Sequence, residues 1–224
     1  MPHLAVLERR ALAETLRHVD PDGPTLSGEW TAAQLAAHLV LRERSGVELL
    51  GRLPSKRMQQ IAQREIDRLV AEQPYPQIVA AIDSGVSWRD VQLPIPTAAI
   101  WALPPVREKA NLIEYLVHNE DVRRAQPGWA PRELPADLVA EVWRRLPISI
   151  RLTMRRVPIG VTLAWPGEGE VQTPRAKRHG AKVTVTGDPI ELLLFTFGRR
   201  KVANVELTGS AEDIAALQQA PVGL

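Results

Sequence analysis

The chain has 224 residues, of which 45% are hydrophobic and 24% are charged, and its formal net charge at pH 7 is +2. This length allows one large domain or two small ones, and either can bury a core without covalent cross-links. The absence of cysteine excludes disulfide scaffolds, cysteine-ligated metal centres and a cysteine nucleophile. A bound metal would therefore need His, Asp or Glu ligands.

Hydropathy and charge exclude two further classes of partner. No apolar run approaches the ~18–20 residues that span a bilayer, and the N-terminus lacks the pattern of a secretory signal. The 28 basic and 26 acidic residues are spread evenly, without the basic stripe typical of nucleic-acid binding. We therefore expect a cytoplasmic protein that binds neither membrane nor nucleic acid. Basic runs at Arg175, Lys177 and Arg178 and at residues 199–201 would suit an anion, although such runs usually form a solvated face.

The first 133 residues carry helical patterns separated by breaks. Apolar residues from Leu4 to His18 recur with the period of an amphipathic helix, and Thr31 with Gln34 forms a capping-box pattern for the next helix. Between residues 86 and 106 lies a proline-rich connection with Trp88 and Trp101, of a length that is often functional. The predicted helices cover residues 4–18, 32–50, 55–72, 76–82 and 106–125, and the first four of them suggest a helical bundle.

After Pro158 the hydrophobic period changes from that of a helix to that of a strand. A helix at residues 136–154 precedes the change, and the N-cap residues Asp188 and Ser210 predict two later helices, at residues 188–195 and 211–219. The predicted strands are residues 159–165, 181–186 and 202–207. The predicted fold class is α+β, with a four-helix bundle at residues 1–133 and a small α+β domain at residues 134–224.

Two of the five histidines stand in patterns that suggest metal binding. Glu114 and His118 are four residues apart on a predicted helix, so both side chains can reach one bound cation. His38 lies within an otherwise apolar helical stretch, where a buried imidazole needs a partner. If the two helices face one another, His38, Glu114 and His118 form a two-histidine, one-carboxylate set that leaves a coordination position open.

Each part of this pattern also has a purely structural interpretation. A lone Glu-x-x-x-His on a helix is more often a surface ion pair. A lone histidine on an apolar face, such as His38, is more often a satisfied core residue.

Three sequence segments resemble a known family. Trp30 with residues 31–44, and residues 111–125, resemble the histidine-bearing motifs of DinB-like metal-binding proteins related to mycothiol-dependent maleylpyruvate isomerase. Residues 183–195 with Gly198 and Arg199 resemble the C-terminal domain of the same group, so the resemblance spans nearly the whole chain. One departure is Asn119, where that family favours a second histidine. This residue points about 100° away from His118 on a helix, so the change removes no ligand.

The resemblance implies a four-helix bundle that holds one divalent ion, usually zinc, through His38, Glu114 and His118. It also implies that mycothiol binds at the metal and that its sulfur performs the chemistry, which suits a chain without cysteine. Ligand type alone leaves Ni²⁺, Fe²⁺ and Co²⁺ open beside Zn²⁺. Asp121 could orient a ligand or a bound water, and Arg42 could meet a carboxylate, although both could equally form a surface salt bridge.

Two functions follow as hypotheses. The first is a metal-dependent, mycothiol-using isomerase or thiol transferase that acts on a small electrophile, with Arg42 and Asp121 as candidate catalytic residues. The second is a metal-binding sensor or interaction module without catalysis. The expected partners of the first are a low-molecular-weight thiol and a small substrate, and the chain is expected to be a monomer or a homodimer.

Overall fold

The computed structural model describes residues 3–44, 55–85 and 104–222, which form two compact units, Met1–Pro131 and Arg132–Leu224. The first unit is helical in its described part, and the second combines helices with a four-stranded sheet. Within the described part, no helix is both long and apolar enough to cross a membrane. The predicted α+β class is therefore confirmed, whereas the four-helix bundle stays a prediction.

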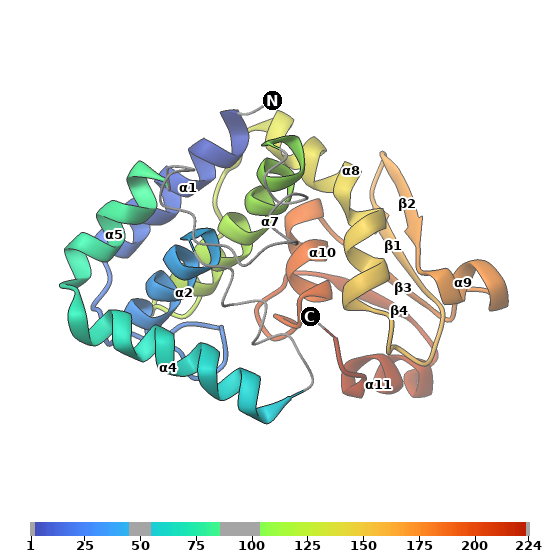
Figure 1. Ribbon diagram of the computed structural model, residues 1–224. Coiled ribbons are helices and arrows are strands. Elements are labelled where there is room, and N and C mark those ends of the chain that lie inside the picture. The colour runs from blue at the N-terminus through green and yellow to red at the C-terminus, as the bar shows by residue number, and fades with distance from the viewer. Residues whose placement is uncertain (1–2, 45–54, 86–103, 223–224) are drawn as a thin grey trace. The chain divides into compact units, whose positions relative to one another are not determined.

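The helices of the first unit pack around a shared apolar core. Helix α1 packs against α7 and α5, and α2 packs against α4 and α5 (Figure 1). Leu12 and Leu16 of α1 meet Leu35 and Leu39 of α2 in this core, and all four are almost fully buried. The helices are α1 (His3–Arg17), α2 (Ala32–Arg44), α4 (Lys56–Glu72), α5 (Tyr75–Ser84) and α7 (Pro104–Arg123).

The predicted capping box at the start of α2 is confirmed. The Gln34 backbone N–H donates to Oγ1 of Thr31 at 3.3 Å, and the Thr31 N–H donates to Oε1 of Gln34 at 3.1 Å. Two N–H groups that a helix start leaves without intrahelical partners are thereby satisfied. This cap fixes where α2 begins and thus the turn of α2 on which His38 lies.

The second unit places its sheet in the order β2-β1-β3-β4. Strand β1 runs parallel to β3, whereas β2 and β4 are antiparallel to their neighbours. Helix α10 is buried along its whole length and packs against α8 (Figure 1). The elements are α8 (Ala136–Thr153), β1 (Val161–Trp165), β2 (Gly169–Gln172), α9 (Pro174–His179), β3 (Val183–Thr186), α10 (Pro189–Thr196), β4 (Glu206–Gly209) and α11 (Ala211–Gln219).

Several sequence expectations need correction. Strand β2 and helix α9 were not predicted, because the pattern of β2 is polar and mostly exposed and α9 has only 6 residues, fewer than two turns. The last strand lies at Glu206–Gly209 rather than at residues 202–207. Asp188 holds the N-cap position of α10, but its side chain makes no capping hydrogen bond, whereas Ser210 caps α11 as predicted. The expected end of the second helix, near residue 50, and the connection with Trp88 and Trp101 lie outside the described residues.

The basic run at residues 199–201 has a structural role. Arg200 donates to the carbonyl oxygens of Gln218 at 2.6 Å and Ala220 at 3.0 Å, so its guanidinium caps the C-terminus of α11. Burial lowers the pKa of Arg200. Arg199 donates to the carbonyl oxygen of Phe197 at 2.6 Å. Arg199 and Arg200 therefore bond backbone carbonyl groups of their own unit. From the sequence alone, the run was expected to bind an anion or to form a solvated face.

Candidate functional site

The structure brings the three candidate ligands together inside the first unit. The ring centroids of His38 on α2 and His118 on α7 are 5.5 Å apart, with their planes at 76°. Nε2 of His118 lies 3.6 Å from Oε2 of Glu114, one helical turn earlier. Both histidines are buried, and the Glu114 side chain is 12% exposed. The predicted convergence of α2 and α7 at these residues therefore exists in the fold.

The second ring nitrogen of His118 faces a buried carboxylate. Nδ1 lies 3.0 Å from Oδ2 of Asp121, which follows three residues later on α7 and is fully buried. The same carboxylate oxygen accepts a hydrogen bond of 2.7 Å from Oγ of Ser27. A histidine with one ring nitrogen hydrogen-bonded to a carboxylate has a fixed orientation. Its other ring nitrogen then faces the position that a metal ion would occupy.

The electrostatic environment favours positive charge at this ring. Burial by itself disfavours the imidazolium and lowers the pKa of His118. The hydrogen bonds and negative charges of Asp121 and Glu114 outweigh burial and raise the pKa of His118 to about 9. Without a metal, the neutral-pH protein therefore holds an imidazolium between two carboxylates. A bound cation would meet the same favourable charges.

Arg42 and Asp121 both contact the candidate ligands rather than forming a surface pair. Nε of Arg42 lies 3.7 Å from Oε1 of Glu114, and its Nη1 donates to Oδ1 of Asn111 at 2.6 Å. The Arg42 side chain is only 9% exposed, and Asp121 is fully buried beside His118. Arg42 thus offsets the charge of Glu114, and Asp121 orients the His118 ring.

Sequence reasoning missed two side chains that touch the histidines. The Trp30 ring lies 4.7 Å from the His38 ring between centroids, and its Nε1 donates to Oε1 of Gln63 at 2.9 Å. Ser27 lies beside both Asp121 and His118. Trp30 directly precedes the first histidine-bearing motif, but no periodicity marks a turn residue such as Ser27 as a neighbour of α7.

The donor types at this site suit a divalent ion of the zinc class. Two imidazoles and one carboxylate form the typical protein ligand set of an open catalytic zinc site, and Asp121 supports one of the imidazoles from behind. In residues 3–44, 55–85 and 104–222, however, no three His, Asp or Glu side chains are already spaced to hold a metal ion. The separation of 3.6 Å between Nε2 of His118 and Oε2 of Glu114 is close to that of two donors on one tetrahedral ion, so His38 is the ligand that would have to move.

Two further histidines, His18 and His179, have exposed side chains, unlike the two candidate ligands. The His18 side chain is 73% exposed and its ring bonds the carbonyl oxygen of Glu14. His179 is exposed at the end of α9.

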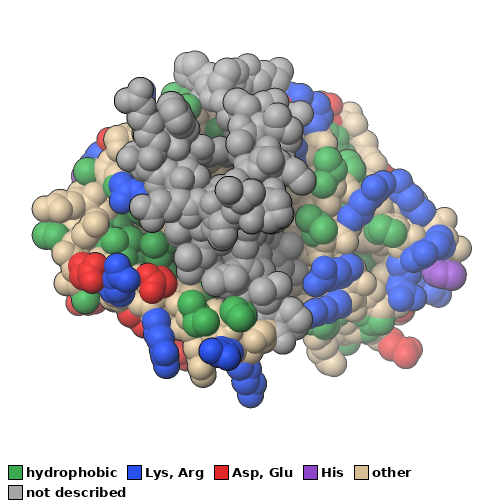
Figure 2. Space-filling model, viewed as in Figure 1, with side chains coloured by type: hydrophobic (Ala, Val, Ile, Leu, Met, Phe, Trp, Pro, Cys, Tyr) green, Lys and Arg blue, Asp and Glu red, His purple; other side chains and the backbone are tan. Residues whose placement is uncertain are grey.

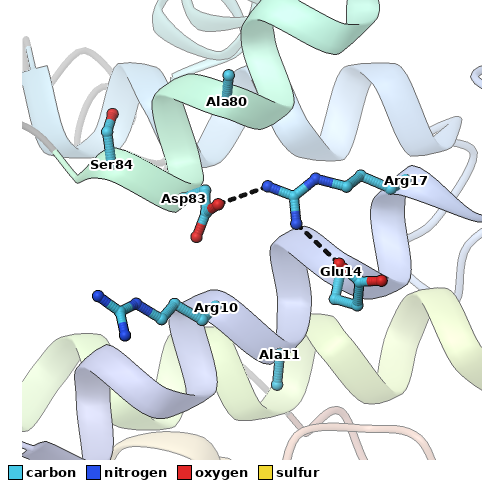
Figure 3. Close-up of a pocket in the computed structure, with 7 residues that line it drawn as sticks. All are labelled: Arg10, Ala11, Glu14, Arg17, Ala80, Asp83 and Ser84. Carbon is cyan, nitrogen blue, oxygen red and sulfur yellow. Dashed lines mark hydrogen bonds and ion pairs between the residues drawn. The ribbon is translucent and has the colours of Figure 1, made fainter.

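A pocket of about 740 Å³ lies elsewhere in the first unit, between α1 and α5 (Figure 3). Arg17 crosses it to bond both Glu14 and Asp83, so ion pairs occupy part of its wall. None of the three candidate ligands lines it. The lining residues are Arg10, Ala11, Glu14, Arg17, Ala80, Asp83 and Ser84.

Comparison with solved structures finds the same fold in mycothiol-dependent maleylpyruvate isomerase. A histidine-to-alanine mutant of that enzyme aligns with a TM-score of 0.57 and 15% identity, over 92% of this chain and 91% of that chain. A second crystal structure of the isomerase aligns with a TM-score of 0.54 and 16% identity over the same shares. No family model and no curated protein sequence matches the chain. At this identity the likeness shows the fold, and the site assignments remain proposals.

Proposed function

We propose that the protein is a divalent-metal-dependent enzyme that uses a low-molecular-weight thiol, mycothiol or a close analogue, to isomerise or modify a small electrophile. The observation that carries the proposal is the buried meeting of His38, Glu114 and His118, with Asp121 on the outer nitrogen of His118. Support for the thiol comes from the fold shared along nearly the whole chain with mycothiol-dependent maleylpyruvate isomerase.

Each residue of the site has a distinct task in this proposal. His38 and His118 would donate ring nitrogens, and Glu114 would donate a carboxylate oxygen. Asp121 keeps the His118 ring oriented, and Arg42 balances the charge of Glu114. A bound divalent ion would lower the pKa of a coordinated thiol and thereby supply a thiolate nucleophile near neutral pH. The burial of both histidines keeps bulk water away from this centre.

Metal analysis of the purified protein tests the ligand assignment. We expect about one divalent ion per chain in the wild type, and we expect His38→Ala to lose it because one of three protein ligands is removed. His179→Ala is the matched control, since His179 is an exposed histidine in the other unit. Full metal occupancy in His38→Ala protein would overturn the assignment.

Thermal unfolding with mycothiol tests the thiol part of the proposal. A ligand that binds only the folded state at 100 times its dissociation constant stabilises it by about 2.7 kcal/mol. We expect mycothiol to raise the Tm of the metal-loaded protein, and we expect a chelator to abolish that rise. If mycothiol does not change the Tm of the metal-loaded protein, the thiol part of the proposal is wrong and only the metal-binding part remains.

A further inference from the structure

The segment that joins α1 to α2, residues 18–31, reaches both candidate imidazoles. We call it the α1–α2 loop. Oγ of Ser27, in this loop, lies 3.3 Å from Nδ1 of His118, and the ring centroid of Trp30 lies 4.7 Å from that of His38. One short segment therefore contacts histidines that belong to two different helices.

The α1–α2 loop is itself fixed to α7 and to the residues just after it. The backbone N–H of Leu26 donates to the carbonyl oxygen of Asp121 at 3.0 Å, and the Gln126 side chain donates to the carbonyl oxygen of Pro24 at 3.0 Å. Inside the loop, Oγ1 of Thr25 donates to the carbonyl oxygen of Trp30 at 2.7 Å. These bonds hold Ser27 and Trp30 at set positions relative to each other and to α7.

Ser27 acts on His118 through one carboxylate oxygen. Oδ2 of Asp121 accepts the Ser27 hydroxyl at 2.7 Å and faces Nδ1 of His118 at 3.0 Å. A buried carboxylate oxygen held by two donors has little freedom to rotate. The ring is thereby kept in one orientation, with Nδ1 toward Asp121 and Nε2 on the side of Glu114.

Trp30 acts on His38 through ring contact. Its indole plane is tilted 42° to the imidazole, and its N–H is bonded to Gln63 on α4, which fixes the indole from behind. An indole held in this way limits the rotation of the imidazole about its own side-chain bonds.

We propose that the α1–α2 loop is a positioning element of the site, in which Ser27 fixes the His118 ring through Asp121 and Trp30 fixes the His38 ring. The inference rests on the proposed function in so far as these rings are metal ligands. Ser27 and Trp30 are positioning residues, because each acts through another side chain.

The first test uses metal-free protein and the ring ¹H–¹⁵N spectrum of its histidines. We expect Ser27→Ala to shift the Nδ1 signal of His118 and Trp30→Leu to shift the ring protons of His38. Gln63→Met releases the indole without removing it, which keeps the test informative if Trp30→Leu does not fold. His18 and His179 serve as internal references, and Tyr75→Phe is the control variant, because its hydroxyl bonds α1 at Leu16. Rings that do not respond to the loop variants would overturn the proposal.

The second test is a Co²⁺ titration followed by visible absorption. Loss of a group that supports a ligand from behind weakens metal binding about 10–100-fold. We expect a loss at the lower end of this range in Ser27→Ala, because Ser27 acts on the ligand through Asp121, with recovery in Ser27→Thr and no change in Tyr75→Phe. Wild-type affinity in Ser27→Ala would contradict the role of Ser27. If the wild type itself binds no Co²⁺, the proposed metal site fails, while the ring spectra still decide whether the loop positions the histidines.

Discussion

Asp121 links the local folding of the chain to the chemistry of the site. Its backbone carbonyl accepts the Leu26 N–H, and its carboxylate joins Ser27 to His118. A fully buried carboxylate costs several kcal/mol unless donors surround it, so these contacts are needed for folding as well as for orientation. The spacing of His118 and Asp121 made their contact predictable, because residues three apart on a helix are neighbours. The Ser27 contact was not predictable, since it depends on how a turn lies on a distant helix.

Tyr75 offers a pH test of stability that is independent of the metal site. Its hydroxyl donates to the carbonyl oxygen of Leu16 at 2.7 Å, and burial together with the charge of Asp20 raises its pKa to about 12. The folded state therefore keeps the proton that the unfolded state loses near pH 10. The stabilisation is complete below about pH 10 and is lost as the pH rises toward 12.

We expect Tyr75→Phe to unfold about 1 kcal/mol more easily than the wild type at pH 8, the usual effect of losing one hydrogen bond. Between pH 10 and pH 12 the free-energy difference between the two proteins should shrink and then reverse. In this range the unfolded wild type is stabilised by ionisation of Tyr75, whereas the folded wild type keeps the phenol neutral and Tyr75→Phe has no phenol to ionise. Urea unfolding of both proteins across this range measures the difference. A pH-independent difference would show that the phenol ionises as readily in the folded state.

At the scale of elements, the contact of α1 with α7 includes an asymmetric polar pair. Oγ1 of Thr15 donates to Oδ1 of Asn119 at 2.7 Å and is also 3.0 Å from the carbonyl oxygen of Ala11. Nδ2 of Asn119 is buried and has no hydrogen-bond partner within the described part of the chain. Thr15 thus has a second acceptor, whereas the Asn119 amide depends on Thr15.

This asymmetry predicts unequal effects in a double-mutant cycle. Thr15→Val should cost about 1–3 kcal/mol of unfolding free energy, because it leaves the Asn119 amide buried without its donor. Asn119→Leu should cost less, and Thr15→Val should be nearly neutral in its presence. Urea midpoints of the four proteins, compared at equal m values, give the coupling. Additive effects would mean that the two side chains do not interact.

Gly160 marks a close approach between the turn before β1 and the end of α9. A Cβ at this position would lie 2.1 Å from the carbonyl oxygen of Gly180, which is far inside contact distance. We expect Gly160→Ala to lower the Tm much more than Gly167→Ala, where φ is +81° but no atom lies within 4 Å. The control should cost only the ~1–2 kcal/mol of a left-handed backbone. If Gly160→Ala and Gly167→Ala lower the Tm equally, the turn before β1 and the end of α9 can move apart at little cost.

Elements with strong local signals were predictable, and those set by pairing were not. Capping residues located α2 and α11, because Thr31, Gln34 and Ser210 bond their own helix ends. The last strand was predicted too early in the chain, at residues 202–207, because the apolar residues before β4 have the pattern of a strand. In the structure the first of these residues form no strand. There the N–H of Asn204 bonds the Glu191 side chain instead of a neighbouring strand. An edge strand that pairs on one side only leaves little pattern in the sequence.

At the scale of the whole molecule, the second unit carries a local group of basic side chains. Figure 2 shows Lys and Arg side chains gathered around α9. Arg175, Lys177 and Arg178 are exposed and form no ion pair within the described residues. This agrees with the solvated face that such a run usually forms, and the expectation that the protein binds no nucleic acid stays a prediction.

The division into two units allows the site to be tested in isolation. All three candidate ligands and both positioning residues belong to Met1–Pro131, and each unit buries its own set of apolar side chains. If these side chains suffice, a fragment of residues 1–131 should bind Co²⁺ with the affinity of the full chain, and a fragment of residues 132–224 should bind none. Circular dichroism on heating would show whether each fragment unfolds cooperatively. If the 1–131 fragment is folded but only the full chain binds Co²⁺, then His38, Glu114 and His118 are not sufficient, and the second unit supplies a further ligand.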